Sequence, residues 1–337
     1  MIGYYVHHVG NGHLHRACSV AAALGVPVTG LSSLPRPPDW LGDWITLPRD
    51  DERQASGDVT AGGRLHWAPT HDPGLRARMS LVSSWIDVAA PDLVVVDVSA
   101  EVAVLARLHG VPVVSFVLPG HRDDEAHLLG YGVSSALVAA WPSSAAGMLQ
   151  GLPTPLAARV EHLGAISRFP VSPERERPPG PLRVTVLSGG GGGGPRREVV
   201  EAARSATPGW TWTVLGGPGG EWVRDPLPVI RDADVVVCQA GQNTIAEVAA
   251  ARRPAVVVPA DRPHDEQLAT ARTLAAGDWP VLVESEFPVD GWQARLDRAA
   301  RLDGQAWENW CDGRGAERMA AVVRRVVDEH DVRPVVA

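Results

Sequence analysis

Short runs of apolar residues alternate along the chain with alanine-rich stretches that have helical spacing. The apolar runs predict strands at Ile2–Val6, Val26–Thr29, Leu93–Val96, Val111–Val117, Val184–Leu187, Thr211–Leu215, Val235–Cys238, Ala255–Val258 and Val281–Val283. The stretches between them predict helices at Leu14–Leu24, Ala100–His109, Glu198–Ala206, Thr244–Ala251 and Asp265–Ala276. Runs that are apolar on both faces are typical of parallel strands covered by helices. The pattern therefore predicts an α/β fold with doubly wound sheets.

A proline-rich and charged segment, Phe169–Pro181, separates two parts of the chain. This composition predicts a stiff, solvated linker, and a new strand with a glycine loop follows it. We therefore predict a Rossmann-like domain over 1–168, a linker over 169–181 and a second Rossmann-like domain over 182–315. Ligands of such folds bind at the carboxyl ends of the strands, so we expect them in a cleft between the domains. The stretch 35–73 is interpreted as loops.

The chain has 337 residues, a formal net charge of -8 and no lysine, so its 31 basic residues are all arginine. The absence of lysine excludes Schiff-base chemistry and a lysine-containing phosphate loop. An anion must instead be bound by arginine, by backbone N–H groups or by a helix N-terminus. Arginines and acids are interspersed, which argues against a nucleic-acid-binding protein.

Three cysteines, Cys18, Cys238 and Cys311, lie far apart in the chain. Their odd number and wide spacing predict reduced thiols in a cytoplasmic protein. No apolar run approaches the roughly 18–20 residues of a membrane span, so we expect no transmembrane segment. The first residues have the pattern of a strand, without a basic region or cleavage site, and we expect no signal peptide.

The first candidate site is the turn Gly10-Asn-Gly12-His13-Leu-His15-Arg16, between the first strand and the first helix. It departs from a dinucleotide fingerprint, because His15 replaces the third glycine and no acid ends the second strand. An NAD enzyme is therefore not expected. A neutral imidazole here can accept a proton from a hydroxyl at pH 7. His13 is thus a candidate general base, and a structural histidine is the alternative.

Histidines at positions 7, 8, 13 and 15 raise the question of a metal site. Side chains alternate along a strand, so His7 and His8 should point to opposite faces. No cluster of cysteine or aspartate completes a ligand set, and we predict no metal.

Asp97 follows the apolar run Leu93–Val96, at the carboxyl edge of the predicted sheet. A carboxylate at this edge could orient His13 and stabilise the imidazolium as it forms. The alternative is that Asp97 caps the helix that begins near Ser99.

Ser188 and the glycine run Gly189–Gly194 follow the first strand of the second predicted domain. Backbone N–H groups of such a loop, together with the next helix N-terminus, suit a phosphate. A surface turn is the alternative.

The run Ala233-Asp-Val-Val-Val-Cys-Gln-Ala-Gly241-Gln-Asn-Thr244-Ile-Ala-Glu247 predicts a buried strand, a glycine turn and a helix. Thr244 and Glu247 have the spacing of a capping box. The functional alternative is that Glu247 binds two hydroxyls of a ribose. A polar cluster that includes Glu266 and Gln267 follows the next strand, where sugar hydroxyls could be bound.

From Ala233 to Ala271 the sequence closely resembles the carboxyl half of MurG-type glycosyltransferases of family 28. The resemblance rests on the A-D-V-V-V-C-x-x-G-x-x-T-x-x-E run, the P-A-x-x-V-P strand and the acid-and-glutamine cluster. The turn at Gly10 resembles the amino-terminal loop of the same superfamily. Gly164-Ala-Ile-Ser-Arg168 is similar to the family's Gly-Asn-Pro-Val-Arg, with three positions changed, and the phosphate loop carries extra glycines.

This resemblance implies a GT-B fold: two Rossmann-like domains, a cleft between them and a terminal helix over 316–337 that packs back on the first. It implies an inverting, metal-independent transfer from a nucleotide sugar, most simply a UDP-sugar, to an acceptor hydroxyl. His13 would be the base with Asp97 behind it, and no cofactor is implied. The implied donor-binding residues are Gly12, Arg168, Ser188, Gly189, Gly190, Gly191, Gly241, Gln242, Asn243, Thr244, Glu247, Glu266 and Gln267. The acceptor, whether a small molecule, a glycan or a lipid-linked sugar, is left open.

Three alternatives share much of this pattern. The stretch from Gly10 to Cys18 is also similar to the UDP-sugar hydrolase of pseudaminic acid synthesis, which has the same fold and uses water as the acceptor. A sugar-nucleotide 2-epimerase and a non-catalytic nucleotide-sugar-binding protein are the other two.

Overall fold

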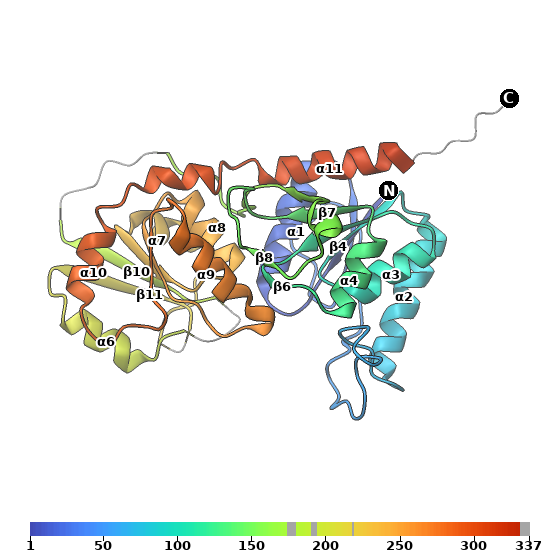
Figure 1. Ribbon diagram of the computed structural model, residues 1–337, viewed down its shortest axis with the longest axis horizontal. Helices are drawn as coiled ribbons and strands as arrows, with labels where there is room; N and C mark the ends of the chain where they lie inside the picture. Colours follow the sequence, from blue (N-terminus) through green and yellow to red (C-terminus); the bar gives the residue numbers. More distant parts are fainter. Residues whose placement is uncertain (174–179, 190–193, 218, 331–337) are drawn as a thin grey trace. The chain divides into compact units, whose positions relative to one another are not determined.

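A computed structural model describes residues 1–173, 180–189, 194–217 and 219–330 (Figure 1). The chain divides into two compact units. The first unit comprises Met1–Ala140, Gly151–Leu163 and the segment from Ala316 onward. The second unit comprises Trp141–Gln150 and Gly164–Gly315.

The first unit is built on a parallel sheet whose described strands run in the order β3-β2-β1-β4-β5-β7-β9. Strands β1, β4 and β5 are buried along their whole length, as suits apolar strands covered on both faces. Strand order reverses between β1 and β4, and ligands of open α/β sheets bind at such a switch point. The elements are β1 (Ile2–Val6), α1 (Asn11–Leu24), β2 (Val28–Ser32), β3 (Trp44–Thr46), α2 (Pro73–Ala89), β4 (Leu93–Asp97), α3 (Ala100–Leu108), β5 (Val113–Val117), β6 (Gly120–His121), α4 (Glu125–Val133), β7 (Ala136–Ala139), α5 (Thr154–Ala157), β9 (Val160–His162) and α11 (Gly315–His330).

The second unit repeats this plan with a parallel sheet in the order β11-β10-β12-β13-β14 among its described strands. Its strand order reverses between β10 and β12. Its core contains Val184, Val235 and Trp212, whose ring packs edge-on against Trp292 at 5.3 Å. The elements are β8 (Leu149–Gln150), β10 (Leu182–Leu187), α6 (Arg197–Ser205), β11 (Trp210–Leu215), α7 (Leu227–Asp232), β12 (Val235–Cys238), α8 (Gln242–Ala250), β13 (Ala255–Val257), α9 (Glu266–Ala276), β14 (Val281–Val283) and α10 (Trp292–Ala299), with short 3-10 helices at Pro263–Asp265 and Gly304–Asn309.

The α/β, doubly wound fold predicted from the sequence is confirmed. The interpretation of 35–73 as loops is wrong for β3, a three-residue edge strand too short to form an apolar run. Helix α2 begins at the end of this stretch, because Asp72 accepts a hydrogen bond from the Leu75 N–H at 2.7 Å and caps it. Helix α1 begins at Asn11, three residues before the predicted start, so Gly12 and His13 lie in its first turn.

The boundary between the two units lies before the proline-rich segment that was predicted as the linker. After β9, the Ala165 N–H donates to the Trp310 carbonyl at 2.9 Å, which places the chain in the second unit before the predicted linker over 169–181. Residues 174–179 of that linker lie outside the described residues. The segment Trp141–Gln150 also belongs to the second unit, where the Thr273 hydroxyl donates to the Ala146 carbonyl at 3.4 Å.

From Ala316, helix α11 belongs to the first unit. Arg318 donates to the Leu163 carbonyl at 2.8 Å, and Arg324 donates to the Leu24 carbonyl at the end of α1 at 3.1 Å. Its amphipathic sequence therefore packs on the first unit. Among the helices of the described residues, none combines the length and apolar character that a membrane crossing requires.

Candidate active site

The switch point of the first unit holds His13 and Asp97. Strand β1 pairs with β4 up to Val6 and Asp97, and Gly10, with a φ of 85°, turns the chain from β1 into α1. A positive φ is accessible to glycine without strain. The turn places His13 in the first turn of α1, where its Nδ1 lies 2.9 Å from Asp97 Oδ1. The Asp97 side chain is fully buried, whereas the His13 side chain is 20% exposed.

Arg16 completes this site. Its Nε donates to Asp97 Oδ2 at 2.9 Å, its Nη2 donates to Asp97 Oδ1, and its guanidinium lies 4.5 Å from the centre of the Phe116 ring. The same Nη2 lies 3.1 Å from His13 Nδ1. Burial alone would raise the pKa of the Asp97 carboxyl, but Arg16 and then His13 hold it well below its usual value. Asp97 is therefore ionised and held by a bidentate arginine.

The contacts at His13 Nδ1 decide which tautomer the site favours. Asp97 can only accept a hydrogen bond there, and Arg16 can only donate one. Asp97 is the nearer of the two, and Arg16 already has both carboxylate oxygens as acceptors. The Nδ1–H tautomer satisfies all three groups. It leaves the lone pair on Nε2, the nitrogen that can accept a proton.

The backbone around Asp97 excludes the alternative of a helix cap. The Ser99 side chain, not that of Asp97, accepts a hydrogen bond from the Val102 N–H and caps α3. Between the two, Val98 has a φ of 66°, which is strained for a β-branched residue. Strain of this kind persists where the surroundings enforce it and is common at active sites.

His7 lies beside this site. The rings of His7 and His8 stack at 5.1 Å with an interplanar angle of 13°, and the His7 ring lies 5.6 Å from that of His13. The prediction that His7 and His8 point to opposite faces is wrong, because β1 ends at Val6 and the alternation of a strand does not continue. Burial first, then the neighbouring histidines, lowers the pKa of His7 to about 3, so this ring is neutral at pH 7.

In the second unit, the switch point brings Ser188 and Gly189 close to the first turn of α8. A Cβ on Gly189 would lie 4.0 Å from Thr244 Oγ1. Ser188 is buried, and its N–H donates to the Leu215 carbonyl at 2.9 Å, so its hydroxyl rather than its N–H is available to a ligand. Gly190 and Gly191, predicted with them, lie outside the described residues.

Helix α8 begins one turn earlier than a capping box would require. Gly241 is its N-cap, and Gln242, Asn243 and Thr244 form its first turn. Thr244 therefore lies inside the helix, and the capping-box alternative for Thr244 and Glu247 is wrong. The N–H groups of this first turn form the kind of helix N-terminus that binds anions.

Glu247 and Arg168 are joined directly. Arg168 Nε donates to Glu247 Oε1 at 2.7 Å, and the Arg168 guanidinium lies 4.5 Å from the centre of the Phe169 ring. Burial raises the pKa of Glu247, and Arg168 opposes this shift. The sequence predicted both residues as donor-binding but did not predict that they pair. A carboxylate has two oxygens, so this bond does not by itself prevent Glu247 from accepting ribose hydroxyls.

The polar cluster before α9 is held close to Gly241. Gln267 is buried, its Oε1 accepts from the Ala260 N–H at 2.9 Å, and a Cβ on Gly241 would lie 3.7 Å from its Nε2. Glu266 is the first residue of α9. The two residues before it, His264 and Asp265, have φ values of 60° and 56°, a second strained segment at a predicted ligand edge.

The sequence of the second unit matches a known family. The model of the glycosyltransferase family 28 C-terminal domain matches residues 223–285, which run from α7 to β14. The second unit carries a family 28 glycosyltransferase domain. The first-turn residues of α8, Glu247, Glu266 and Gln267 all lie within this domain.

Curated relatives match a short stretch of the chain. A UDP-N-acetylglucosamine–N-acetylmuramyl-(pentapeptide) pyrophosphoryl-undecaprenol N-acetylglucosamine transferase from Cronobacter sakazakii is 37% identical over 87 residues, which are 25% of this chain and 24% of that protein. The enzyme of the same name from Neisseria meningitidis is 41% identical over 66 residues, 19% of this chain and 18% of that protein. The matches thus span about a quarter or less of each relative.

Solved structures of glycosyltransferases share the fold over nearly the whole chain. The glycotransferase of kitacinnamycin superposes with a TM-score of 0.64 and 16% identity over 96% of this chain and 98% of that one. MurG from Acinetobacter baumannii gives 0.60 and 16%, over 96% and 99% of the two chains. A calicheamicin glycosyltransferase gives 0.59 and 17%, over 97% and 96%. The family 28 domain is therefore part of a chain with the GT-B fold.

Sequence reasoning gave no role to two features of the first unit. Arg16 stands three residues after His13, the spacing that brings side chains together on a helix, and this signal was available in the sequence. A group formed by His66, Asp124 and His127 had no such signal, because its members are up to 61 positions apart.

Proposed function

We propose that this protein is an inverting glycosyltransferase that moves a sugar from a UDP-sugar to an acceptor hydroxyl. The observation that carries the proposal is the His13–Asp97–Arg16 site of the first unit in a chain whose second unit holds a family 28 domain. The relatives named above use a UDP-N-acetylglucosamine donor, which favours a UDP-sugar here. A cytoplasmic location is part of the proposal, supported by three free cysteines.

The donor would be held by the second unit, and the lack of lysine decides how. The diphosphate would face the N–H groups of the first turn of α8, the Ser188 hydroxyl, the backbone at Gly189 and the Arg168 guanidinium. Glu247 would accept hydroxyls of the ribose, and Glu266 and Gln267 would bind hydroxyls of the sugar. These fixed donors would take the charge of the leaving diphosphate, so we propose a reaction without a metal ion.

His13 would act as the general base of the transfer. Its Nε2 takes the proton of the acceptor hydroxyl while the acceptor oxygen attacks the anomeric carbon. The bond from that carbon to the diphosphate oxygen breaks as the new bond forms on the opposite face, so the configuration inverts. Asp97 stabilises the imidazolium through Nδ1–H. Arg16 fixes the position of Asp97 through two hydrogen bonds.

Water as the acceptor is the rival reaction, favoured by the turn from Gly10 to Cys18. The test is to incubate the protein with UDP-sugars, alone and with a panel of hydroxyl acceptors, and to measure UDP and free sugar. We expect UDP release to depend on an acceptor, and His13→Ala to lower turnover by about 10²–10⁴-fold with near-normal donor binding. Rapid release of free sugar without an acceptor would show a hydrolase. Donor binding without turnover in any mixture would refute both.

A further inference from the structure

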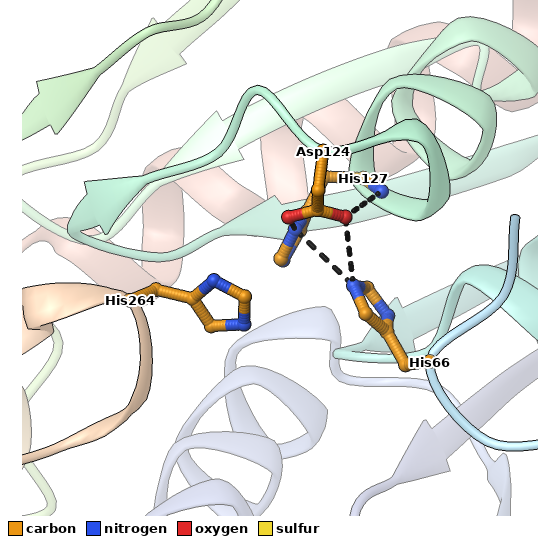
Figure 2. A group of neighbouring side chains, drawn as sticks. All are labelled: His66, Asp124, His127 and His264. Atoms are coloured by element: carbon orange, nitrogen blue, oxygen red, sulfur yellow. Dashed lines mark hydrogen bonds and ion pairs between the residues drawn. The ribbon is translucent and has the colours of Figure 1, made fainter. Parts of the chain in front are cut away.

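A second group of chemically active side chains lies in the first unit, apart from the His13 site. His66, from the loop before α2, and His127 of α4 both face the carboxylate of Asp124, which caps α4 (Figure 2). His66 Nε2 lies 3.2 Å from Asp124 Oδ1 and 3.2 Å from His127 Nδ1, and His127 Nδ1 lies 2.5 Å from Asp124 Oδ2. His264, which Figure 2 also draws, belongs to the second unit and has no part in the site inferred below.

The hydrogen bonds around the carboxylate converge on one small volume. Arg122 Nη1 faces His127 Nε2, so His127 carries its hydrogen on Nδ1 and donates it to Asp124 Oδ2. His66 Nε2 can donate to the other carboxylate oxygen. A cation that replaced these two hydrogens would have both nitrogens and the carboxylate as ligands.

Two of the three distances fit such a cation, and the third, 2.5 Å from His127 Nδ1 to Asp124 Oδ2, is a hydrogen bond that the ion would replace. In a tetrahedral zinc site with bonds of about 2.0–2.1 Å, two ligand atoms are separated by about 3.3–3.4 Å. Both distances from His66 Nε2 are close to this value. Two imidazoles and a carboxylate are ligands that zinc accepts, and three protein ligands leave a position for water. We propose that His66, Asp124 and His127 form a divalent metal site for which zinc is the best match.

Backbone contacts hold the three ligands in place. Glu101 Oε1 accepts from the His66 N–H at 2.7 Å and the Trp67 N–H at 3.1 Å, which fixes the loop to α3. Asp124 Oδ1 accepts from the His127 N–H at 3.0 Å as the cap of α4. A metal ion here would join the loop before α2 to α4. This role does not depend on the proposed function.

Arg122 opposes metal binding at this site. Its Nη1 lies 3.2 Å from His127 Nε2, while its Nε and Nη2 donate to backbone carbonyls. Coordination through Nδ1 moves the ring proton to Nε2, so Arg122 must turn Nη1 away from the ring. The site should therefore bind zinc more weakly than a closed four-ligand structural site.

A rival group of donors, His8, Asp50 and Asp51, is less suitable. Arg49 donates to both carboxylate oxygens of Asp51, and Arg78 lies 3.2 Å from His8 Nδ1 and 3.6 Å from Asp50 Oδ2. Two arginines thus already neutralise the carboxylates of this group. His8→Gln is the variant that tests it.

The experiment titrates zinc into chelator-treated full-length protein and measures binding by calorimetry, with cobalt absorption as a second reading. We expect one ion per chain. In His66→Gln and in His127→Gln the affinity for zinc should fall by at least about 10–100-fold, because losing even a residue that supports a metal ligand has an effect of this size. The matched control His109→Gln, at the far end of α3, should bind as the parent does. Circular dichroism establishes that each variant is folded.

Cleavage of the loop by trypsin provides a second measurement of metal binding in the unmodified chain. Arg64 lies two residues before His66 with its side chain 67% exposed, and trypsin cleaves after arginine. Zinc at 100 times its dissociation constant should slow this cleavage by up to about 100-fold if the cut requires the loop to leave the site. Absence of saturable binding, equal binding in His66→Gln and His127→Gln, or loss of binding only in His8→Gln would each overturn the proposal.

Discussion

The buried pair of Asp97 and Arg16 allows one substitution to test stability and mechanism together. In Asp97→Asn the shape of the side chain is retained, but the negative charge is lost. The Arg16 cation, with 2% of its side chain exposed, then loses the carboxylate to which it donates two hydrogen bonds. Breaking a buried ion pair from one side costs about 3–5 kcal/mol. The free energy of unfolding, measured in urea, should fall by this amount.

The dependence on pH separates the charge from other effects of the substitution. Because Arg16 and His13 hold the pKa of Asp97 below its usual value against the effect of burial, the folded chain keeps this carboxylate ionised to lower pH than the unfolded chain. The stabilisation is fully present above the unfolded pKa of about 3.9 and is lost as pH falls below it toward the folded pKa. The difference between parent and Asp97→Asn should therefore be largest near pH 7 and shrink below pH of about 4. A difference constant from pH 7 to pH 3 would refute this reasoning.

Enzyme activity provides an independent measurement on the Asp97→Asn variant. An asparagine amide can donate to His13 Nδ1, which moves the ring proton to Nε2 and removes the base. An asparagine in place of the aspartate of such a pair lowers turnover by about 10⁴-fold through the wrong tautomer. His13→Ala should lose activity with little loss of stability, because His13 is partly exposed. The double variant Arg16→Gln with Asp97→Asn should be more stable than the two single losses predict, since it removes both charges of the buried ion pair. Strict additivity would contradict the ion pair.

Three further outcomes follow from the structure. Glu247→Gln removes the negative charge that Arg168 and a ribose would share. A hydrogen bond to a charged group is worth about 1.5–3 kcal/mol, so the donor KM should rise by about 10–150-fold with kcat less affected. An unchanged KM would contradict a ribose contact. Val98→Gly removes the strain of a positive φ. After the entropic cost of glycine, the free energy of unfolding should rise by about 1 kcal/mol. A fall in the free energy of unfolding would show that Val98 stabilises the fold through packing. Ser99→Ala removes the cap of α3 and should lower the melting temperature through a loss of about 0.5–2 kcal/mol, against an exposed serine-to-alanine control.

Local pattern was enough to place the elements and the chemistry at the strand ends. The runs at β1, β12 and β14 match the observed strands to the residue, because they are continuous. His13 and Asp97 were predicted as partners from their positions at strand ends, and they lie 2.9 Å apart. Other elements were missed: the 17-residue helix α2, the nine-residue helix α4 and the four-residue strand β7.

The lack of lysine and the order of motifs are properties of the sequence alone, and they already required that arginine or backbone bind any phosphate. Which arginine does what was decided by tertiary structure. Arg16 meets Asp97 across 81 positions, and Arg168 meets Glu247 across 79. Likewise His66 meets Asp124 across 58 positions. Such pairings depend on how parallel strands order themselves in a sheet, a long-range choice that no local spacing of residues encodes.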